Sequence, residues 1–327
     1  MNTISERDFT TYPRQFMAYR WFKPLLTGLL FALFFFLFAP LVYIITSVVF
    51  HTTVSSSGYN DLDFYSAAGA FFNSAMVAIY IPSLLLASLI VKDRPVSSYF
   101  SSMGGWRWKT FLKTFAAGFV IFGIPIIIRF LLSGRTGDVQ FTTGGFISLI
   151  MFMPLACIAE ELLFRSLIMQ TVSSWFRLPV IGLIVQAIAF AAVHPYNLTG
   201  VIYIALSAFI YGLISICTKG IETSSALHIL NNMIELIMGG IGFGKLAAEQ
   251  TLSSTLIVII LKLLFLAFII YADRKRHWFD EKRYDDTEKF MQSMIEKEHH
   301  CAVDPYILYC RTASAEDMAG EPAGALY

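Results

Sequence analysis

The sequence predicts an all-α fold, a polytopic membrane bundle of about eight transmembrane helices. Of the 327 residues, 56% are hydrophobic and only 14% are charged, which lies outside the usual composition of a soluble domain. Most charged residues stand near the two ends of the chain or in a few loops, and the formal net charge is only +1. A nucleic-acid partner is therefore not indicated, and lipid is the expected surrounding.

Apolar stretches recur along the chain at the length that a membrane span requires. A helix needs about 20 residues to cross the ~30 Å hydrocarbon core of a bilayer. The stretches that approach or exceed this length are residues 25–50, 66–91, 110–132, 145–170, 178–196, 200–218, 223–242 and 252–272. The first is too long for the apolar part of a signal peptide and lacks a small-residue cleavage pattern, so we expect it to be retained.

The predicted spans divide the chain into three parts. Residues 1–24 form an N-terminal segment, residues 25–273 form the bundle, and residues 274–327 form a polar tail with a short amphipathic helix and a disordered end. Lysine and arginine are frequent before the first span and after the last, but absent from the loop at 51–65. Because cytoplasmic loops carry the excess of these residues, we expect a multi-pass protein of the cell membrane with both termini cytoplasmic.

Three groups of polar residues interrupt the apolar spans, and the first contains Glu160, Glu161 and Arg165. A charge at the centre of a bilayer helix costs roughly 2.5 to 3.5 kcal/mol on insertion scales, so such residues are functional candidates. Glu161 and Arg165 are four residues apart and share a helical face, where they can neutralise each other. Glu160 points about 100° away and is expected to lie outside this pair. The alternative is a buried structural ion pair with a spectator glutamate.

The second group is Phe190 and His194, and Pro195 follows the histidine directly. A residue before proline is pushed out of the α region, so we expect His194 at a helix end or kink. Glu161 and His194 each lie about sixteen residues from the turn near Arg177, which at ~1.5 Å per residue predicts matching depths. A buried histidine with a purely structural hydrogen bond is the alternative interpretation.

The third group is His228 and Asn232, whose four-residue spacing places them on one helical face. Asn231 and Glu235 are near in sequence but are expected to face elsewhere. We expect the two groups with histidines to meet the glutamates inside one bundle, because the intervals between them suit successive helices.

The predicted depth of His228 conflicts with this expectation, because the residue follows closely after the loop at 220–225. The sequence therefore predicts that His228 lies less deeply in the membrane than His194. Either this loop enters the bundle, or the hairpin formed by spans 145–170 and 178–196 extends beyond the membrane surface.

These residue types are suited to hydrolysis of an acyl bond. A glutamate beside a histidine can deprotonate a water molecule, and a second histidine with an amide can donate to the oxyanion that forms. The same side chains could instead bind zinc and lower the pKa of its water to about 7. The sequence has neither the HExxH pattern of zinc proteases nor the GxSxG pattern of serine hydrolases, and its four cysteines form no CxxC pair.

The three groups, in this order and spacing, resemble the motifs of the CPBP family, also called the Abi family, of CAAX proteases and bacteriocin-processing proteins. The resemblance covers the spans from 145–170 to 223–242 and implies a protease-like core at 144–243 that encloses an intramembrane peptidase site. It implies that Glu160 with His194 activates water and that His228 and Asn232 stabilise the oxyanion.

The resemblance further implies that Glu161 and Arg165 support the catalytic groups. Family members are usually labelled metalloproteases, although a metal-free glutamate mechanism is also argued, so a zinc cofactor stays open. The candidate ligands of such a metal are Glu160, His194 and His228. The expected partners are a peptide or protein substrate at or in the membrane and the lipid bilayer, and the substrate itself is not indicated.

A function from a different class is compatible with the same residues. A transporter or a non-catalytic bacteriocin-immunity protein could use the polar centre to bind a peptide or a proton. Such a protein would need Glu160 for binding but would cleave nothing, whereas a peptidase releases new chain termini.

Overall fold

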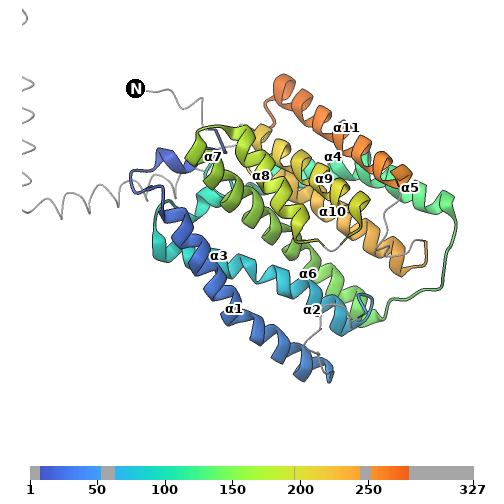
Figure 1. Cartoon of the computed structure of the whole chain (residues 1–327). Coiled ribbons are helices and arrows are strands. Elements are labelled where there is room, and N and C mark those ends of the chain that lie inside the picture. The colour runs from blue at the N-terminus through green and yellow to red at the C-terminus, as the bar shows by residue number, and fades with distance from the viewer. Residues whose placement is uncertain (1–7, 53–62, 195, 244–251, 280–327) are drawn as a thin grey trace, which may run out of the picture.

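The computed structural model describes residues 8–52, 63–194, 196–243 and 252–279, and every regular element in these ranges is a helix (Figure 1). The longer helices are α1 (Lys23–Phe50), α2 (Ala67–Ala78), α3 (Tyr80–Val91), α4 (Trp108–Gly118), α5 (Ile124–Ser133), α6 (Thr143–Glu161), α8 (Pro179–Ala192), α9 (Leu198–Cys217), α10 (Glu222–Gly240) and α11 (Leu252–Arg276). Shorter elements are the 3-10 turns Tyr12–Gln15 and Val96–Tyr99, the π-helical segments Phe119–Gly123 and Leu162–Met169, and α7 (Gln170–Phe176). The predicted polytopic helix bundle is confirmed.

Each of the eight predicted spans contains helix, but the spans differ in length and polarity. Among the described residues, six helices are long and apolar enough to cross a membrane. They are Lys23–Phe50, Ala67–Val91, Trp108–Ser133, Thr143–Phe176, Leu198–Cys217 and Thr255–Arg276. The stretch predicted at 178–196 is the shorter helix α8 of 14 residues, and the one at 223–242 is the 19-residue helix α10 with several polar side chains. The predicted amphipathic helix and disordered end of the tail, at 280–327, lie outside the described residues.

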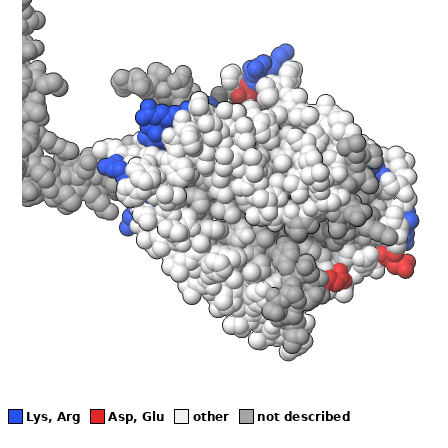
Figure 2. Space-filling model, viewed as in Figure 1, with Lys and Arg blue, Asp and Glu red and all other residues white. Residues whose placement is uncertain are grey.

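The surface of the bundle is largely apolar, as a helix surface facing lipid must be. Figure 2 shows one face that is almost free of charged residues, with lysine and arginine gathered mainly at its margins. Large apolar side chains of α1, including Leu29, Leu33 and Phe36, are more than 60% exposed. Because lipid is as apolar as these side chains, their exposure is compatible with a membrane and would not be with water.

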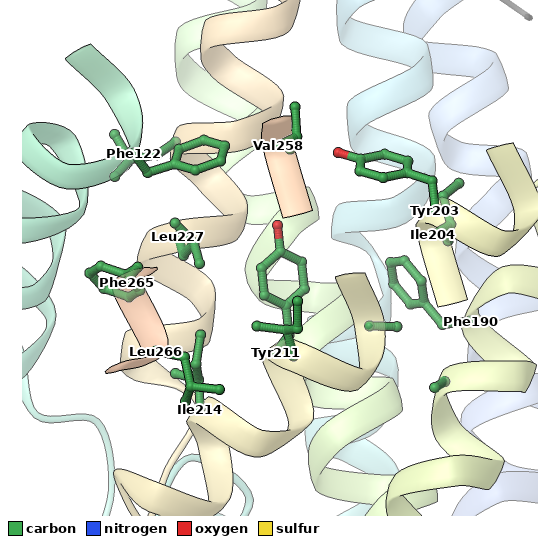
Figure 3. Packing of buried hydrophobic residues seen from close by; sticks show 14 of the residues in the cluster. Phe122, Phe190, Tyr203, Ile204, Tyr211, Ile214, Leu227, Val258, Phe265 and Leu266 are labelled. Carbon is green, nitrogen blue, oxygen red and sulfur yellow. The ribbon is translucent and has the colours of Figure 1, made fainter. Parts of the chain in front are cut away.

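Helix α10 lies inside the bundle and packs against α4, α6 and α9. The largest cluster of buried apolar residues surrounds it and includes Phe190 of α8, Tyr211 of α9, Leu227 of α10 and Phe265 of α11 (Figure 3). The polar side chains that this helix buries must find hydrogen-bond partners in the protein, because an unpaired buried polar group is costly. The buried polar residues of α10 are therefore expected to contact neighbouring helices.

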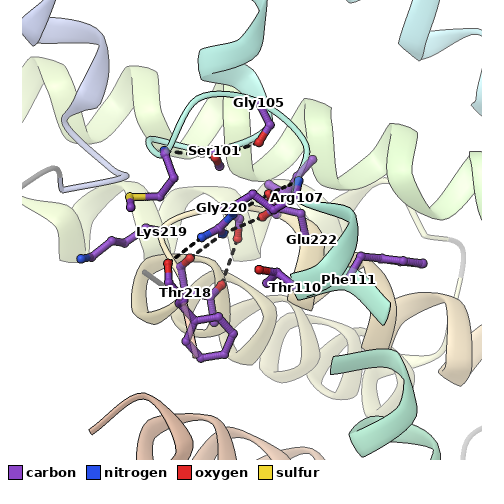
Figure 4. A network of polar contacts seen from close by, with 12 residues as sticks. Ser101, Gly105, Arg107, Thr110, Phe111, Thr218, Lys219, Gly220 and Glu222 are labelled. Carbon is purple, nitrogen blue, oxygen red and sulfur yellow. Dashed lines mark hydrogen bonds and ion pairs between the residues drawn. The ribbon is translucent and has the colours of Figure 1, made fainter. Parts of the chain in front are cut away.

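A buried ion pair between Arg107 and Glu222 holds the start of α10 (Figure 4). Both side chains are 0% exposed, and the guanidinium donates to the carboxylate at 2.8 and 2.9 Å and to the Thr218 carbonyl at 2.7 Å. Gly220 lies beside the pair, where a Cβ would come 2.6 Å from the Cβ of Ser101 and would clash with the Glu222 carboxylate. Only a glycine lets the two backbones approach this closely.

The loop that precedes His228 is buried against neighbouring segments of the chain. Residues 220–225 are all buried, and the segment 96–107 contacts the start of this loop. The Ile221 amide donates to the Phe100 carbonyl at 2.9 Å, and the Ser102 amide donates to the Lys219 carbonyl at 3.0 Å. The loop is therefore enclosed by protein, and α10 begins inside the bundle.

Candidate functional site

The two glutamates stand where the regular α-helix of the fourth span changes its pitch. Helix α6 ends at Glu161, and the π-helical segment Leu162–Met169 continues the same span into α7. A π-helix inside an α-helix is uncommon and is frequently found at functional sites. The wider turn alters the direction of the side chains that follow, beginning with the residues around Arg165.

The predicted pair of Glu161 and Arg165 is confirmed. Nη1 of Arg165 lies 3.2 Å from Oε1 of Glu161, and both side chains are 0% exposed. The guanidinium also lies 4.7 Å from the ring centroid of Phe190 and 5.4 Å from that of Tyr211. Arg165 is thus held between a carboxylate and two aromatic faces in the interior of the bundle.

His228 of α10 lies between the two glutamates of α6. Its Nδ1 is 2.9 Å from Oε1 of Glu161, and its Nε2 is 3.4 Å from Oε2 of Glu160. The amide Nδ2 of Asn232 approaches the same Nε2 at 3.4 Å, as the predicted shared face requires. The Glu160 side chain is 18% exposed, whereas that of Glu161 is fully buried. Glu160 is therefore outside the arginine pair, as predicted, and its contact is His228.

His194 lies two residues beyond the end of α8, in agreement with the predicted helix end. Its Nδ1 is 2.7 Å from the Phe190 carbonyl oxygen. A carbonyl can only accept a hydrogen bond, so Nδ1 carries the proton in a neutral ring and Nε2 keeps its lone pair. The observed contact of Glu160 is His228 of α10, whereas the resemblance pairs this carboxylate with His194 in the activation of water.

Both histidines nevertheless contact the same aromatic ring. The ring of Phe190 lies 4.7 Å from that of His194 and 6.0 Å from that of His228, centroid to centroid. Both also line a single cavity of about 100 Å³. Its walls are formed by Phe190, His194, Tyr196, Tyr203, Ile204, Ser207, Tyr211, His228, Asn231, Asn232, Glu235 and Lys262.

Several cavity residues were not predicted from the sequence. Asn231 and Glu235 were expected to face elsewhere, which is wrong, because the cavity extends across a wider arc of α10 than the face of His228 and Asn232. Lys262 of α11 is 1% exposed and was not singled out at all. A lone lysine in the middle of the apolar span 252–272 is the signal that could have identified it, since such a charge is costly in a membrane.

The candidate metal ligands do not form a metal site in the described part of the chain. Glu160 and His228 are neighbours, and the Phe190 ring contacts the rings of both His194 and His228. No group of three or more histidine, cysteine, aspartate or glutamate side chains among the described residues is placed to hold a metal ion. The donor set thus does not fit the three protein ligands of a catalytic zinc.

Comparison with known proteins gives one match. Residues 142–234 match the family described as type II CAAX prenyl endopeptidase Rce1-like. The matched segment includes the two glutamates, Arg165, both histidines and Asn232, and it ends before Glu235 and Lys262. No curated protein and no solved structure matches the chain.

Proposed function

We propose that this chain is an intramembrane endopeptidase. The premise is that residues 142–234 belong to the Rce1-like family of type II CAAX prenyl endopeptidases. The observation that carries the proposal is the row Arg165, Glu161, His228 and Glu160, of which His228 lines the same cavity as His194 and Asn232. A water molecule and a peptide carbonyl at this point would meet a base and hydrogen-bond donors together.

In the proposed reaction, Glu160 accepts a proton from a water molecule, which then attacks the carbonyl carbon of the scissile bond. The lone pair on Nε2 of His194 accepts a hydrogen bond from the same water and helps to orient it. The Asn232 amide and a proton on Nε2 of His228 donate to the oxyanion, and Glu160 returns its proton to the leaving amine. Glu161 and Arg165 hold His228 in place through Nδ1.

The competing function is a transporter or immunity protein that binds at the same cavity. The observation in its favour is the presence of Glu235 and Lys262 on the cavity wall, because ionisable residues inside a membrane also mark ion and proton pathways. The two functions differ in their products, since only a peptidase generates new amino and carboxyl termini.

The decisive experiment is an unbiased search for cleaved peptides. Purified protein in detergent is incubated with a peptide library that includes prenylated carboxyl-terminal peptides, and new termini are identified by mass spectrometry. We expect cleavage by the wild type and none above background by Glu160→Gln. If a folded wild-type protein releases no new terminus, or if both proteins release the same ones, the chain is not the proposed peptidase.

Metal removal provides a separate prediction about mechanism. Because the candidate ligands are not grouped around one point, we expect peptide cleavage to persist after treatment with a strong chelator and dialysis. The measurement is the cleavage rate before chelation, after chelation and after addition of zinc. Loss of activity with the chelator and recovery with zinc would establish a metal mechanism instead.

We also propose that both termini are cytoplasmic, with residues 1–24 and 274–327 flanking the membrane bundle at 25–273. The asymmetry of lysine and arginine supports this orientation in a cell membrane. Single cysteines introduced at 1–23 and 92–109 should react with a membrane-impermeant thiol reagent only after the membrane is opened. Labelling of a cysteine in the loop at 51–65 only from the cytoplasmic side would show the opposite orientation.

A further inference from the structure

Lys262 approaches the candidate site from a helix outside the matched segment. Its ammonium donates to the hydroxyl of Tyr203 at 3.2 Å and to the hydroxyl of Ser207 at 2.9 Å. It also lies 4.9 Å from the ring centroids of both Tyr203 and Tyr211. The lysine is therefore bound to the α9 wall of the cavity by defined contacts.

From Lys262 a chain of hydrogen bonds leads to the proposed oxyanion donors. The hydroxyl of Tyr203 donates to Oδ1 of Asn231 at 3.3 Å. Nδ2 of Asn231 donates to Oδ1 of Asn232 at 3.0 Å, and Nδ2 of Asn232 lies 3.4 Å from Nε2 of His228. Figure 3 shows the hydroxyl of Tyr203 turned toward the interior of the cluster.

The direction of these hydrogen bonds follows from the chemistry of the lysine. An ammonium can only donate, so it occupies a lone pair of the Tyr203 oxygen and leaves the tyrosine proton to be donated onward. Asn231 must then present its carbonyl to Tyr203 and its amino group to Asn232. Asn232 in turn presents its carbonyl to Asn231, so its amino group lies on the side of Nε2 of His228, where the two proposed oxyanion donors are side by side.

We propose that Lys262, Tyr203 and Asn231 are positioning residues that set the orientation of the Asn232 amide, so that N–H groups and not the carbonyl face the reacting oxygen. This rests on the proposed peptidase function. An asparagine amide is nearly symmetric in shape, and packing alone distinguishes its two ends poorly. An amide turned the other way would present a partial negative charge to the oxyanion.

A double-mutant cycle tests the proposal on a peptide that the wild type cleaves. Tyr203→Phe should lower kcat about tenfold, the effect of losing one hydrogen bond, with KM within about twofold of the wild type. In an Asn232→Ala background it should lower kcat no further, because the amide that it orients is gone. Tyr211→Phe is the matched control, since it removes a hydroxyl from the same wall that makes no hydrogen bond to the described residues. Its effect on kcat should be the same in both backgrounds.

A spectroscopic measurement tests the same chain without any activity. In protein with ¹⁵N-labelled asparagine, the side-chain amide signals of Asn231 and Asn232 are assigned from their absence in the corresponding alanine variants. Tyr203→Phe and Lys262→Met should shift both signals, and Tyr211→Phe should leave them in place. If Lys262→Met does not fold, the Tyr203 variant still provides the comparison.

The outcomes separate this inference from the proposed function. Unchanged asparagine signals in Tyr203→Phe overturn the positioning role, as does a loss of kcat that is additive with Asn232→Ala. Shifted signals in a protein that cleaves no peptide would support the hydrogen-bond chain and reject the peptidase.

Discussion

Glu160→Gln is expected to lower the rate of peptide cleavage by about a hundredfold to ten-thousandfold, the usual contribution of a general base. Glutamine has nearly the same shape as glutamate but cannot accept the proton of a water molecule. The carboxylate of Glu160 is partly exposed and stands apart from the buried pair of Glu161 and Arg165, so its neutralisation should leave the fold intact.

The test compares kcat/KM and thermal unfolding in detergent for the wild type and Glu160→Gln. Asp138→Asn serves as the control, because it makes the same chemical change at an exposed position between α5 and α6. We expect similar unfolding temperatures for all three proteins and a loss of cleavage in the Glu160 variant alone. Wild-type cleavage by a folded Glu160→Gln protein would remove Glu160 from the mechanism.

Breaking the pair of Glu161 and Arg165 is expected to have the largest effect on stability. Removing one partner of a buried ion pair strands the other charge and typically costs about 3 to 5 kcal/mol. Glu161→Gln and Arg165→Met should therefore each lower the unfolding temperature strongly. Because His228 donates through Nδ1 to Glu161, both variants should also lose activity.

The double variant, Glu161→Gln with Arg165→Met, shows whether the two residues stabilise the fold as a pair or independently of each other. It should be less destabilised than the sum of the single variants, since no uncompensated charge is left behind. Arg135→Met, at an exposed position, is the control for loss of a guanidinium and should unfold like the wild type. Unchanged unfolding temperatures in both single variants would contradict a supporting role for the pair.

The sequence alone determined the helical, membrane-spanning character of the chain and much of its local geometry. Apolar runs of about 20 residues can satisfy their backbone in lipid only as helices, so their composition predicts their structure. Glu161 contacts Arg165, and His228 contacts Asn232, because residues four apart share a helical face. This relation depends only on the period of the helix. The proline after His194 likewise acts locally, and the histidine does follow a helix end.

Contacts between helices were decided by the tertiary structure. A helical period specifies which residues share a face, but not which neighbouring helix that face meets. The packing of α10 against α6 placed His228 beside Glu160, a contact that the spacing of the motifs did not indicate. The position of α10 in turn depends on Arg107 and Glu222, which are 115 residues apart and join the segment 96–107 to the start of α10. Lys262 reaches the cavity for the same reason: the packing of α11 against α9 brings a lysine from outside the recognisable motifs to Tyr203. Such long-range contacts arise from the fit of whole helices, which no local spacing encodes.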